Sequence, residues 1–443
     1  MDYGLSKPSF PFSVLALTTN KAARMKAATS RPPADRESPQ SEPKLIRSLT
    51  LTHAVLYGLG VTIGAGIYVL VGAAAGRSGM HAPLAFVAAA IAMGITAASF
   101  AELGTRMPVA ASEAAYVQAA FGLRWLSRAA GLLVVAAATI SAATITVGSA
   151  GYLGVFIPLP APWIIAGVVL AMGAVACLSA VQSISFAGLM TVIEIGGLGL
   201  IIFSGVVGDG PLISRLPELW PAAGNLAAWI GIGQTSLLAV FAFIGFEHLV
   251  NISEEMKNPR RTLPSALFIT LGVTALLYAS VVWIAVTAVP PAELALSPAP
   301  LALVFQRLTG LPLQTLSSIA IVATVNGIIV HMIMIGRVLY GLADQGYLPA
   351  FLAKVSAASG TPVIATLLGV VAILILALGI PLTGLAEWTS RFTLAIFALV
   401  NLALIRAKAT ESNHPPDVFI VPKWVPIAGF LTSALLLVVD LFG

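Results

Sequence analysis

The sequence predicts an all-α integral membrane protein with about eleven membrane-spanning helices. Only 9% of the 443 residues are charged, and 58% are hydrophobic. Soluble domains carry about 25% charged residues, so this chain has too few charges to cover a water-facing surface, and lipid must be its main solvent. A membrane β-barrel is excluded because its strands alternate in polarity over about ten residues, whereas the apolar runs here are long and continuous.

Each predicted span is an apolar run close to the roughly 20 residues that a helix needs to cross a bilayer. Polar or Pro- and Gly-rich joints separate the runs, as expected for connections between helices. The runs lie at residues 53–76, 83–104, 128–155, 162–180, 185–208, 231–251, 265–289, 314–342, 362–380, 385–406 and 425–442.

The first fifty residues differ from the rest of the chain. Residues 1–50 are rich in Lys, Arg, Pro and Ser, a composition that buries little apolar surface, and we expect a disordered cytoplasmic tail. A signal peptide is the alternative, but the apolar stretch 10–17 is short and most basic residues follow it. Most of the 23 Lys and Arg residues fall on the same side of the predicted spans as the tail. The positive-inside rule therefore puts the N-terminus in the cytoplasm. The predicted spans together form one transmembrane domain at residues 51–442.

Glycines interrupt the first predicted span within residues 58–68. Each glycine weakens a helix by about 1 kcal/mol relative to alanine, so Gly60, Gly64 and Gly66 predict a break in the middle of the span. Backbone groups freed by a break are costly in hydrocarbon unless they line a cavity or meet a ligand. The alternative is a packing face, because Gly60 and Gly64 have the GxxxG spacing of paired helices.

The sixth predicted span is interrupted as well. Gly245 lies within residues 241–248, and Glu247 and His248 follow it in the same apolar frame. Titratable residues in a span usually face protein or water, although Glu247 could also be a packing residue at the cytoplasmic end. Interrupted helices at matching places in two halves predict a five-plus-five inverted repeat with a binding site at mid-membrane. The repeats would cover about 51–208 and 231–406, with an extra helix at about 425–442.

Four segments, in the expected order and on the expected spans, resemble the amino acid–polyamine–organocation (APC) superfamily. The first span carries a GAGIY sequence similar to the family's GxGIF core, and the second carries AELGTRMP followed by Tyr116 and Phe121-Gly122. The sixth carries FIGFE followed by EEMKNPRR, and the eighth ends in GRVLYGLADQGYLP. The resemblance covers about residues 48–442 and implies an amino acid permease of the LeuT fold.

The resemblance implies a substrate site at the two breaks. The α-carboxylate would meet backbone N–H groups, and the ammonium would meet carbonyl groups, in agreement with the charges at the ends of half-helices. Phe241 would cover the bound substrate, or else be a plain packing aromatic. The implied N–H groups are those of Gly64, Ala65 and Gly66, and the implied carbonyls are those of Thr62 or Ile63 and of Phe241, Ala242 and Ile244, next to the break at Gly245.

The sequence departs from the family pattern in several places. Ala65 stands where a hydroxyl residue is frequent, Gly336 replaces the usual serine, and the chain has eleven predicted spans where twelve are usual. The third span lacks Asp and Glu, which argues against a strongly cationic substrate. The candidate pocket residues are neutral or apolar and favour a neutral amino acid: Ser141, Thr144, Asn326 and Met332.

Glu194 is the candidate for proton coupling. It lies in the middle of the fifth span, where a buried carboxyl group can load and release a proton as the cavity opens to each side. The resembling family often has an ionisable residue in this stretch. The alternative is a carboxyl group hydrogen-bonded to a neighbouring helix for packing. Two i, i+4 pairs, Glu387 with Arg391 and Glu102 with Arg106, are interpreted as structural.

Together these features predict a secondary active transporter of amino acids that works by alternating access and is coupled to protons. An exchanger of amino acids or polyamines and a non-transporting amino acid receptor are the alternatives. An enzyme is not expected, because HExxH, GxSxG and Walker A patterns are absent, and the five histidines are scattered, without metal-ligand spacing. We expect no cofactor and no nucleic-acid partner, and a multi-pass location in the plasma (inner) membrane.

Overall fold

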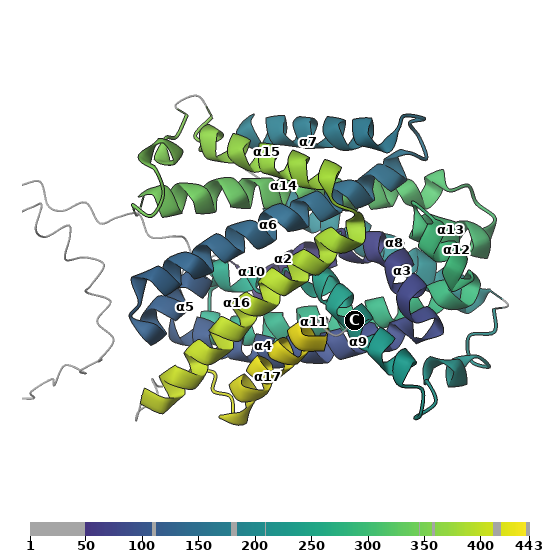
Figure 1. Ribbon diagram of the computed structural model, residues 1–443, viewed down its shortest axis with the longest axis horizontal. Helices are drawn as coiled ribbons and strands as arrows, with labels where there is room; N and C mark the ends of the chain where they lie inside the picture. Colours follow the sequence, from purple (N-terminus) through teal and green to yellow (C-terminus); the bar gives the residue numbers. More distant parts are fainter. Residues whose placement is uncertain are drawn as a thin grey trace, which may run out of the picture. The chain divides into compact units, whose positions relative to one another are not determined.

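The computed structural model describes residues 49–108, 112–178, 184–208, 210–344, 346–356, 359–410 and 418–439. Almost all of the predicted tail, residues 1–48, lies outside these ranges. The described chain is helical (Figure 1), and its β-structure is limited to an isolated bridge between Leu49 and Met256.

A helix coincides with each of the predicted apolar runs, and the first and sixth runs contain two helices each. The longer helices are α2 (Leu51–Ile63), α3 (Gly66–Ser78), α4 (Ala82–Arg106), α5 (Ser112–Phe121), α6 (Arg124–Leu153), α7 (Ala161–Leu178), α8 (Ile184–Val207), α9 (Leu226–Phe243), α11 (Pro259–Ala288), α13 (Pro300–Thr309), α14 (Gln314–Asp344), α15 (Val363–Gly379), α16 (Leu382–Thr410) and α17 (Trp424–Val439). Short elements complete the described chain: α10 (His248–Asn251), α12 (Pro291–Leu296) and the single turns η3 (Gly79–His81), η4 (Leu216–Leu219), η5 (Ser253–Glu255) and η6 (Ala350–Ala353).

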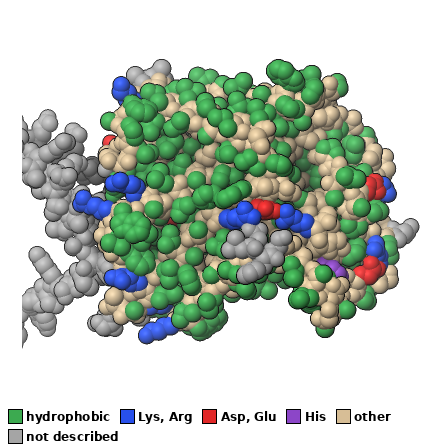
Figure 2. All heavy atoms as spheres, viewed as in Figure 1, with side chains coloured by type: hydrophobic (Ala, Val, Ile, Leu, Met, Phe, Trp, Pro, Cys, Tyr) green, Lys and Arg blue, Asp and Glu red, His purple; other side chains and the backbone are tan. Residues whose placement is uncertain are grey.

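Eight helical stretches of the described chain are long and apolar enough to cross a membrane. This number is lower than the eleven predicted spans for two reasons. The stretch Gly66–Arg106 joins α3, the second half of the first run, to α4, so two runs count as one. The apolar helices of two other runs, α15 and α17, are shorter than 18 residues. Hydrophobic side chains are spread over the visible face, and charged side chains are few (Figure 2). Large hydrophobic side chains such as Leu276 and Ile375 are exposed. Such a surface fits lipid rather than water.

The helices pack in two groups that α16 connects. One group contains α6, α7, α14 and α15, and the other contains α2, α3, α4, α9 and α11 (Figure 1). Helix α16 packs against α6 and also against α9 and α17, while α17 packs against α4. Helix α8 also connects the groups, because it packs against α2 and α11 and against α14, and the broken first span contacts α6 directly through α3.

Local sequence explains several helix ends. Asn225 precedes α9 and its side chain accepts a hydrogen bond from the N–H of Ala228 at 3.1 Å, as an N-cap residue does. Pro259 occupies the first position of α11, where its missing N–H costs nothing. Helix α13 ends at Thr309 and is followed by Gly310, which has the left-handed conformation that glycine tolerates best.

Candidate functional site: the two broken helices

The first span is broken, as its glycines predict. Helix α2 ends at Ile63 and α3 begins at Gly66. Gly64 between them has a φ of 23°, outside the range that residues with side chains readily adopt. The N–H groups in the first turn of α3, which begins at Gly66, have no intrahelical acceptor because of their position. The break therefore creates a set of backbone donors at mid-span.

The sixth span is broken at the predicted glycine. Helix α9 ends at Phe243, and α10 begins at His248. Gly245 between them has a φ of 125°. Its N–H donates a hydrogen bond of 2.9 Å to Oε2 of Glu247, so this buried carboxyl group satisfies a backbone donor that the break has freed. Glu247 is thus bound to the break itself.

The two breaks pack directly against each other through their glycines. A Cβ atom on Gly66 would lie 2.7 Å from Cα of Ala242, and one on Gly245 would lie 2.7 Å from the carbonyl oxygen of Val61. Both neighbours are backbone atoms that cannot move aside cheaply. A side chain at either glycine would therefore push the two broken helices apart.

The packing interpretation of the first span also holds, but at a different glycine. A Cβ atom on Gly60 would collide with Oγ1 of Thr191 on α8, so this glycine permits close packing of α2 and α8. The nearest neighbours of a Cβ atom on Gly64 are carbonyl oxygens of its own helix, at 3.4 Å or more. Gly60 therefore serves helix packing, whereas Gly64 serves the break.

Tyr278 of α11 joins both breaks, and sequence reasoning missed it. Its Oη atom lies 3.1 Å from the carbonyl oxygens of Thr62 and Ile63 and 3.0 Å from that of Ala242. A phenol has one proton and donates to one of these three acceptors at a time. Three carbonyls that the family resemblance assigns to the substrate ammonium thus already have a donor from the protein. The sequence offered only the weak signal of a polar group inside the seventh span.

The predicted substrate residues gather at the breaks and are almost all buried. Ile244 is the partly exposed one. Phe241 is only 4% exposed and packs in a core that includes Ala65 and Leu238, as a packing aromatic does. The buried residues of the predicted site are Thr62, Ile63, Gly64, Ala65, Gly66, Phe241, Ala242 and Gly245.

Two cavities approach the breaks. Their volumes are about 380 and 400 Å³, and they share a wall that includes His248, His331 and Arg337. The first cavity reaches Gly60, Val61 and Asn326, and the second reaches Ser141, Ile244 and Glu247. Arg337 near the end of α14 and Glu255 also line the first cavity, and the carbonyl of Glu255 binds the N–H of Leu49 just before α2. The cavity therefore lies toward the end of the bundle at which α2 begins.

Glu194 of α8 is fully buried beside these breaks. Its Oε1 atom accepts a hydrogen bond of 3.3 Å from the side-chain amide of Asn326 on α14. Its Oε2 atom is buried and has no hydrogen-bond partner. Its backbone carbonyl accepts a 2.8 Å hydrogen bond from the hydroxyl of Tyr68. The helix-to-helix bond of the packing alternative is present, but it satisfies one carboxyl oxygen and leaves the other free for a proton or ligand.

The comparison with known proteins identifies the family. The amino acid permease family matches residues 49–443. The chain belongs to the amino acid permease family. This confirms the resemblance to the APC superfamily that four segments of the sequence carry. The protein is therefore a multi-pass integral membrane protein of amino acid transport and not an enzyme.

Relatives of the permease differ in their named substrates. This chain is 27% identical to the branched-chain amino acid permease BcaP of Bacillus subtilis in an alignment over 440 residues, gaps included. The alignment covers 89% of this chain and 92% of the relative. The chain is 28% identical to the mitochondrial cationic amino acid transporter 3 of Arabidopsis thaliana and 26% identical to its vacuolar cationic amino acid transporter 2. Those matches cover 86% and 84% of this chain but only 65% and 61% of the plant proteins, which are longer.

Histidines that are far apart in the sequence of the permease share the cavity wall. The Nδ1 atom of His331 lies 2.8 Å from the carbonyl oxygen of Gly327, and its Nε2 atom lies 3.1 Å from the hydroxyl of Ser141 on α6. A neutral imidazole that donates from Nδ1 and accepts at Nε2 satisfies both contacts. His331 therefore links α14 to α6. Within the described residues, no cluster of three or more His, Cys, Asp or Glu could hold a metal ion.

Both predicted intrahelical ion pairs are present in the permease, and each has a third partner. Arg391 lies 3.4 Å from Glu387, which also pairs with Arg77 at the end of α3. Arg106 lies 2.5 Å from Glu102, which also pairs with a lysine on α16. The third partners come from distant segments, so the pairs connect helices in addition to bracing their own.

Proposed function

We propose that this permease is a secondary active transporter that moves amino acids by alternating access, with a LeuT-type five-plus-five repeat in residues 51–442. The observation that carries the proposal is the contact between the two breaks, where Gly66 meets Ala242 and Gly245 meets Val61. Mid-span breaks free backbone groups that lipid cannot satisfy, so such breaks are typical of substrate sites in transporters.

The substrate would bind with its two charged ends on the two kinds of helix end. The N–H groups of Gly64, Ala65 and Gly66 would receive the α-carboxylate, since the start of α3 carries the positive end of the helix dipole. The carbonyls at the ends of α2 and α9 would receive the ammonium beside the Tyr278 hydroxyl, which holds these carbonyls in place. Phe241 would cover the site from α9. The carbonyls are those of Thr62, Ile63, Phe241, Ala242 and Ile244, next to Gly245.

The arrangement of the cavities supports a state that is open toward the cytoplasm. Both cavities reach the breaks from the end of the bundle where α2 begins. At the other end, Arg77 of α3 pairs with Glu387 of α16. With the N-terminus in the cytoplasm, as the distribution of Lys and Arg predicts, the cavities open inward. A plasma (inner) membrane location remains part of the proposal.

Proton-coupled symport is the proposed energy source, and Glu194 is its proposed carrier. Its unpartnered, buried Oε2 atom supports this role, because a carboxyl group without a fixed cation can gain and lose a proton as its surroundings change. We also propose a neutral substrate. The similarity to a branched-chain amino acid permease over 92% of that protein's length supports this choice.

Uptake by the purified full-length protein in liposomes tests the proposal. Labelled leucine should accumulate when the outside is acidic and should not accumulate without a pH gradient. A panel of unlabelled amino acids competing for uptake gives the specificity, with lysine and putrescine as the cationic members. Uptake that requires internal amino acid would identify an exchanger. Binding without flux under either condition would identify a receptor and refute the transport proposal.

A further inference from the structure

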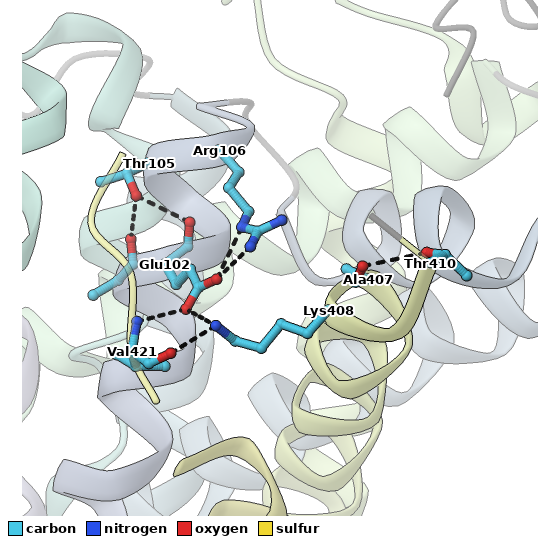
Figure 3. Close-up of polar contacts among 8 residues, drawn as sticks. Glu102, Thr105, Arg106, Ala407, Lys408, Thr410 and Val421 are labelled. Atoms are coloured by element: carbon cyan, nitrogen blue, oxygen red, sulfur yellow. Dashed lines mark hydrogen bonds and ion pairs between the residues drawn. The ribbon is translucent and has the colours of Figure 1, made fainter. Parts of the chain in front are cut away.

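Basic residues at the end of the bundle where α2 begins are of two kinds. Some are neutralised by other parts of the chain. Figure 3 shows Arg106 of α4 and Lys408 of α16, which both bind the buried carboxyl group of Glu102. Others are exposed, and among the described residues Lys257 and Arg261 have no ion-pair partner. A basic side chain that the protein does not neutralise is available to an anion outside the chain.

Exposed basic residues gather immediately before α11 and in its first turn. Lys257, Arg260 and Arg261 are all exposed, and the first turn of α11 contains no acidic residue. Glu254 and Glu255 precede them, and the second of these lines the first cavity. At most one carboxylate of this segment therefore faces the three basic side chains, which together form a positive surface. We call these three residues the α11 basic patch.

An open apolar face of α11 begins at the basic patch. Residues 261, 265, 268, 272 and 276 are exposed and recur every three or four positions, so they share one face of the helix. A Cβ atom on Gly272 would meet nothing within 4 Å, and Phe268 and Leu276 on either side of it are 41% and 71% exposed. Apart from Ser265, the face beyond Arg261 is free of polar side chains over a length of roughly 22 Å.

Positive charge beside an open apolar face fits a phospholipid with an anionic headgroup. The headgroup phosphate would meet the basic patch, and an acyl chain would lie along the face from Phe268 to Leu276. Phe268 lies roughly 10 Å along the helix from Arg261, which is beyond a headgroup layer of about 5–7 Å. In the predicted orientation this end of the bundle is cytoplasmic, and the cytoplasmic leaflet carries anionic lipid. A soluble anion would use the charges alone.

The basic patch is also joined to the start of the first broken span. The N–H of Lys257 donates a 3.0 Å hydrogen bond to the carbonyl oxygen of Leu49, and the N–H of Leu49 donates one of 3.0 Å to the carbonyl oxygen of Glu255. Leu49 lies two positions before α2. A lipid bound to Lys257 would therefore stabilise the segment from which both α2 and α11 begin, because a ligand that binds only the folded state stabilises it.

We propose that the α11 basic patch and the apolar face beside it form a binding site for an anionic phospholipid. The bound lipid anchors the starts of α2 and α11 at the membrane surface. This inference goes beyond the proposed transport function and is tested by binding, so the absence of transport would not affect it.

Charge-matched variants test the contribution of the basic patch. The purified full-length protein is titrated with phosphatidylglycerol in a neutral detergent, and bound lipid is counted by native mass spectrometry. One variant carries Lys257→Gln and Arg261→Gln, and the control carries Arg124→Gln and Lys354→Gln, which removes two exposed charges of other segments at the same end. Each basic residue near a membrane surface contributes about 1 kcal/mol, or about fivefold.

The variant of the patch should therefore bind phosphatidylglycerol about 25-fold more weakly than the wild type, and the control should stay within about twofold. Phosphatidylglycerol should also raise the melting temperature of the wild type and the control, and not that of the patch variant. Equal losses of affinity in the two variants, or no loss in the patch variant, overturn the proposal.

Fluorescence quenching tests the lipid contact without changing any charge. In a Cys177→Ser background, Ser265→Cys places a fluorophore on the apolar face of α11, and Leu368→Cys places one at a similar distance from the start of α15, where the native side chain is 51% exposed. Brominated phosphatidylglycerol should quench at position 265 more strongly than brominated phosphatidylcholine, and the two lipids should quench equally at position 368. Equal quenching by both lipids at position 265, or the same preference at both positions, overturns the proposal.

Discussion

Replacing Tyr278 by phenylalanine removes one hydroxyl group from the centre of the proposed site and keeps the rest of the side chain. The ring stays in place because it packs edge-on against Phe86 and Phe243, with centroid distances of 6.0 and 5.2 Å. What disappears is the one proton that the carbonyls of Thr62, Ile63 and Ala242 share. Three carbonyl groups that point toward one position would then repel each other without a donor between them.

The hydrogen-bond geometry sets the expected size of the effect. Leaving a buried acceptor without its donor costs about 1–3 kcal/mol, which corresponds to about a 5- to 150-fold change in an equilibrium constant. Tyr278 satisfies one acceptor at a time, so the loss belongs to a single hydrogen bond and to the lower part of this range. The breaks would lose their preorganised spacing, and substrate binding would have to restore it. We expect about tenfold weaker binding.

Tyr152 provides a matched control for this experiment. Its hydroxyl is also buried and donates a 2.6 Å hydrogen bond to one backbone carbonyl, that of Tyr68, but it does not touch the carbonyls at the breaks. Substrate affinity and thermal stability of both Tyr→Phe variants are measured in detergent. Both variants should lose stability, and only Tyr278→Phe should lose affinity. Unchanged affinity in Tyr278→Phe, or an equal loss in both variants, would refute the argument that this hydroxyl organises the site.

Three further predictions concern packing, coupling and orientation. Gly66→Ala should abolish substrate binding and destabilise the fold by about 1–3 kcal/mol through overpacking, because the new Cβ atom meets the backbone of Ala242. The control is Gly94→Ala on α4, where a Cβ atom meets nothing within 4 Å. Normal substrate affinity in Gly66→Ala would contradict the packing argument. Glu194→Gln should retain exchange, since a glutamine can still accept the Asn326 hydrogen bond, and should lose accumulation driven by protons; accumulation at the wild-type level would rule out the coupling role. A cysteine in place of Ser30, in a protein that lacks Cys177, should resist an impermeant thiol reagent in intact cells, and rapid labelling would reverse the predicted orientation.

The sequence allowed the helices and their breaks to be predicted because both depend on local properties. Apolar length determines where a span lies, and each predicted run contains a helix. The breaks at Gly64 and Gly245 were also predictable, because a glycine in an apolar run marks each of them. Both residues have positive φ values in the structure, which other residues tolerate poorly. The number of spans is less direct, because α15 and α17 fall below the length that identifies a spanning helix and α3 joins α4 in one stretch.

Contacts between distant segments could not be predicted in the same way. The i, i+4 spacing of Glu102 and Arg106 is visible in the sequence, but nothing in it pairs Glu102 with Lys408, 306 positions later. Tyr278 looks like one more aromatic residue in an apolar run until α11 packs beside both breaks. The shared wall of the two cavities, with His248 and His331, likewise depends on how α10 and α14 meet.

The position of Glu194 has a consequence for the proposed coupling. Its side chain is fully buried and does not line either described cavity, whereas its partner Asn326 lines the first cavity. A proton from the inner side would therefore reach Glu194 only when the helices around it shift enough to connect its carboxyl group with the first cavity. Substrate binding would also act on α2, because the end of α2 carries the proposed ammonium acceptors. Release of the proton and release of the amino acid would then depend on one movement of α2 against α14, which is the requirement for coupled transport.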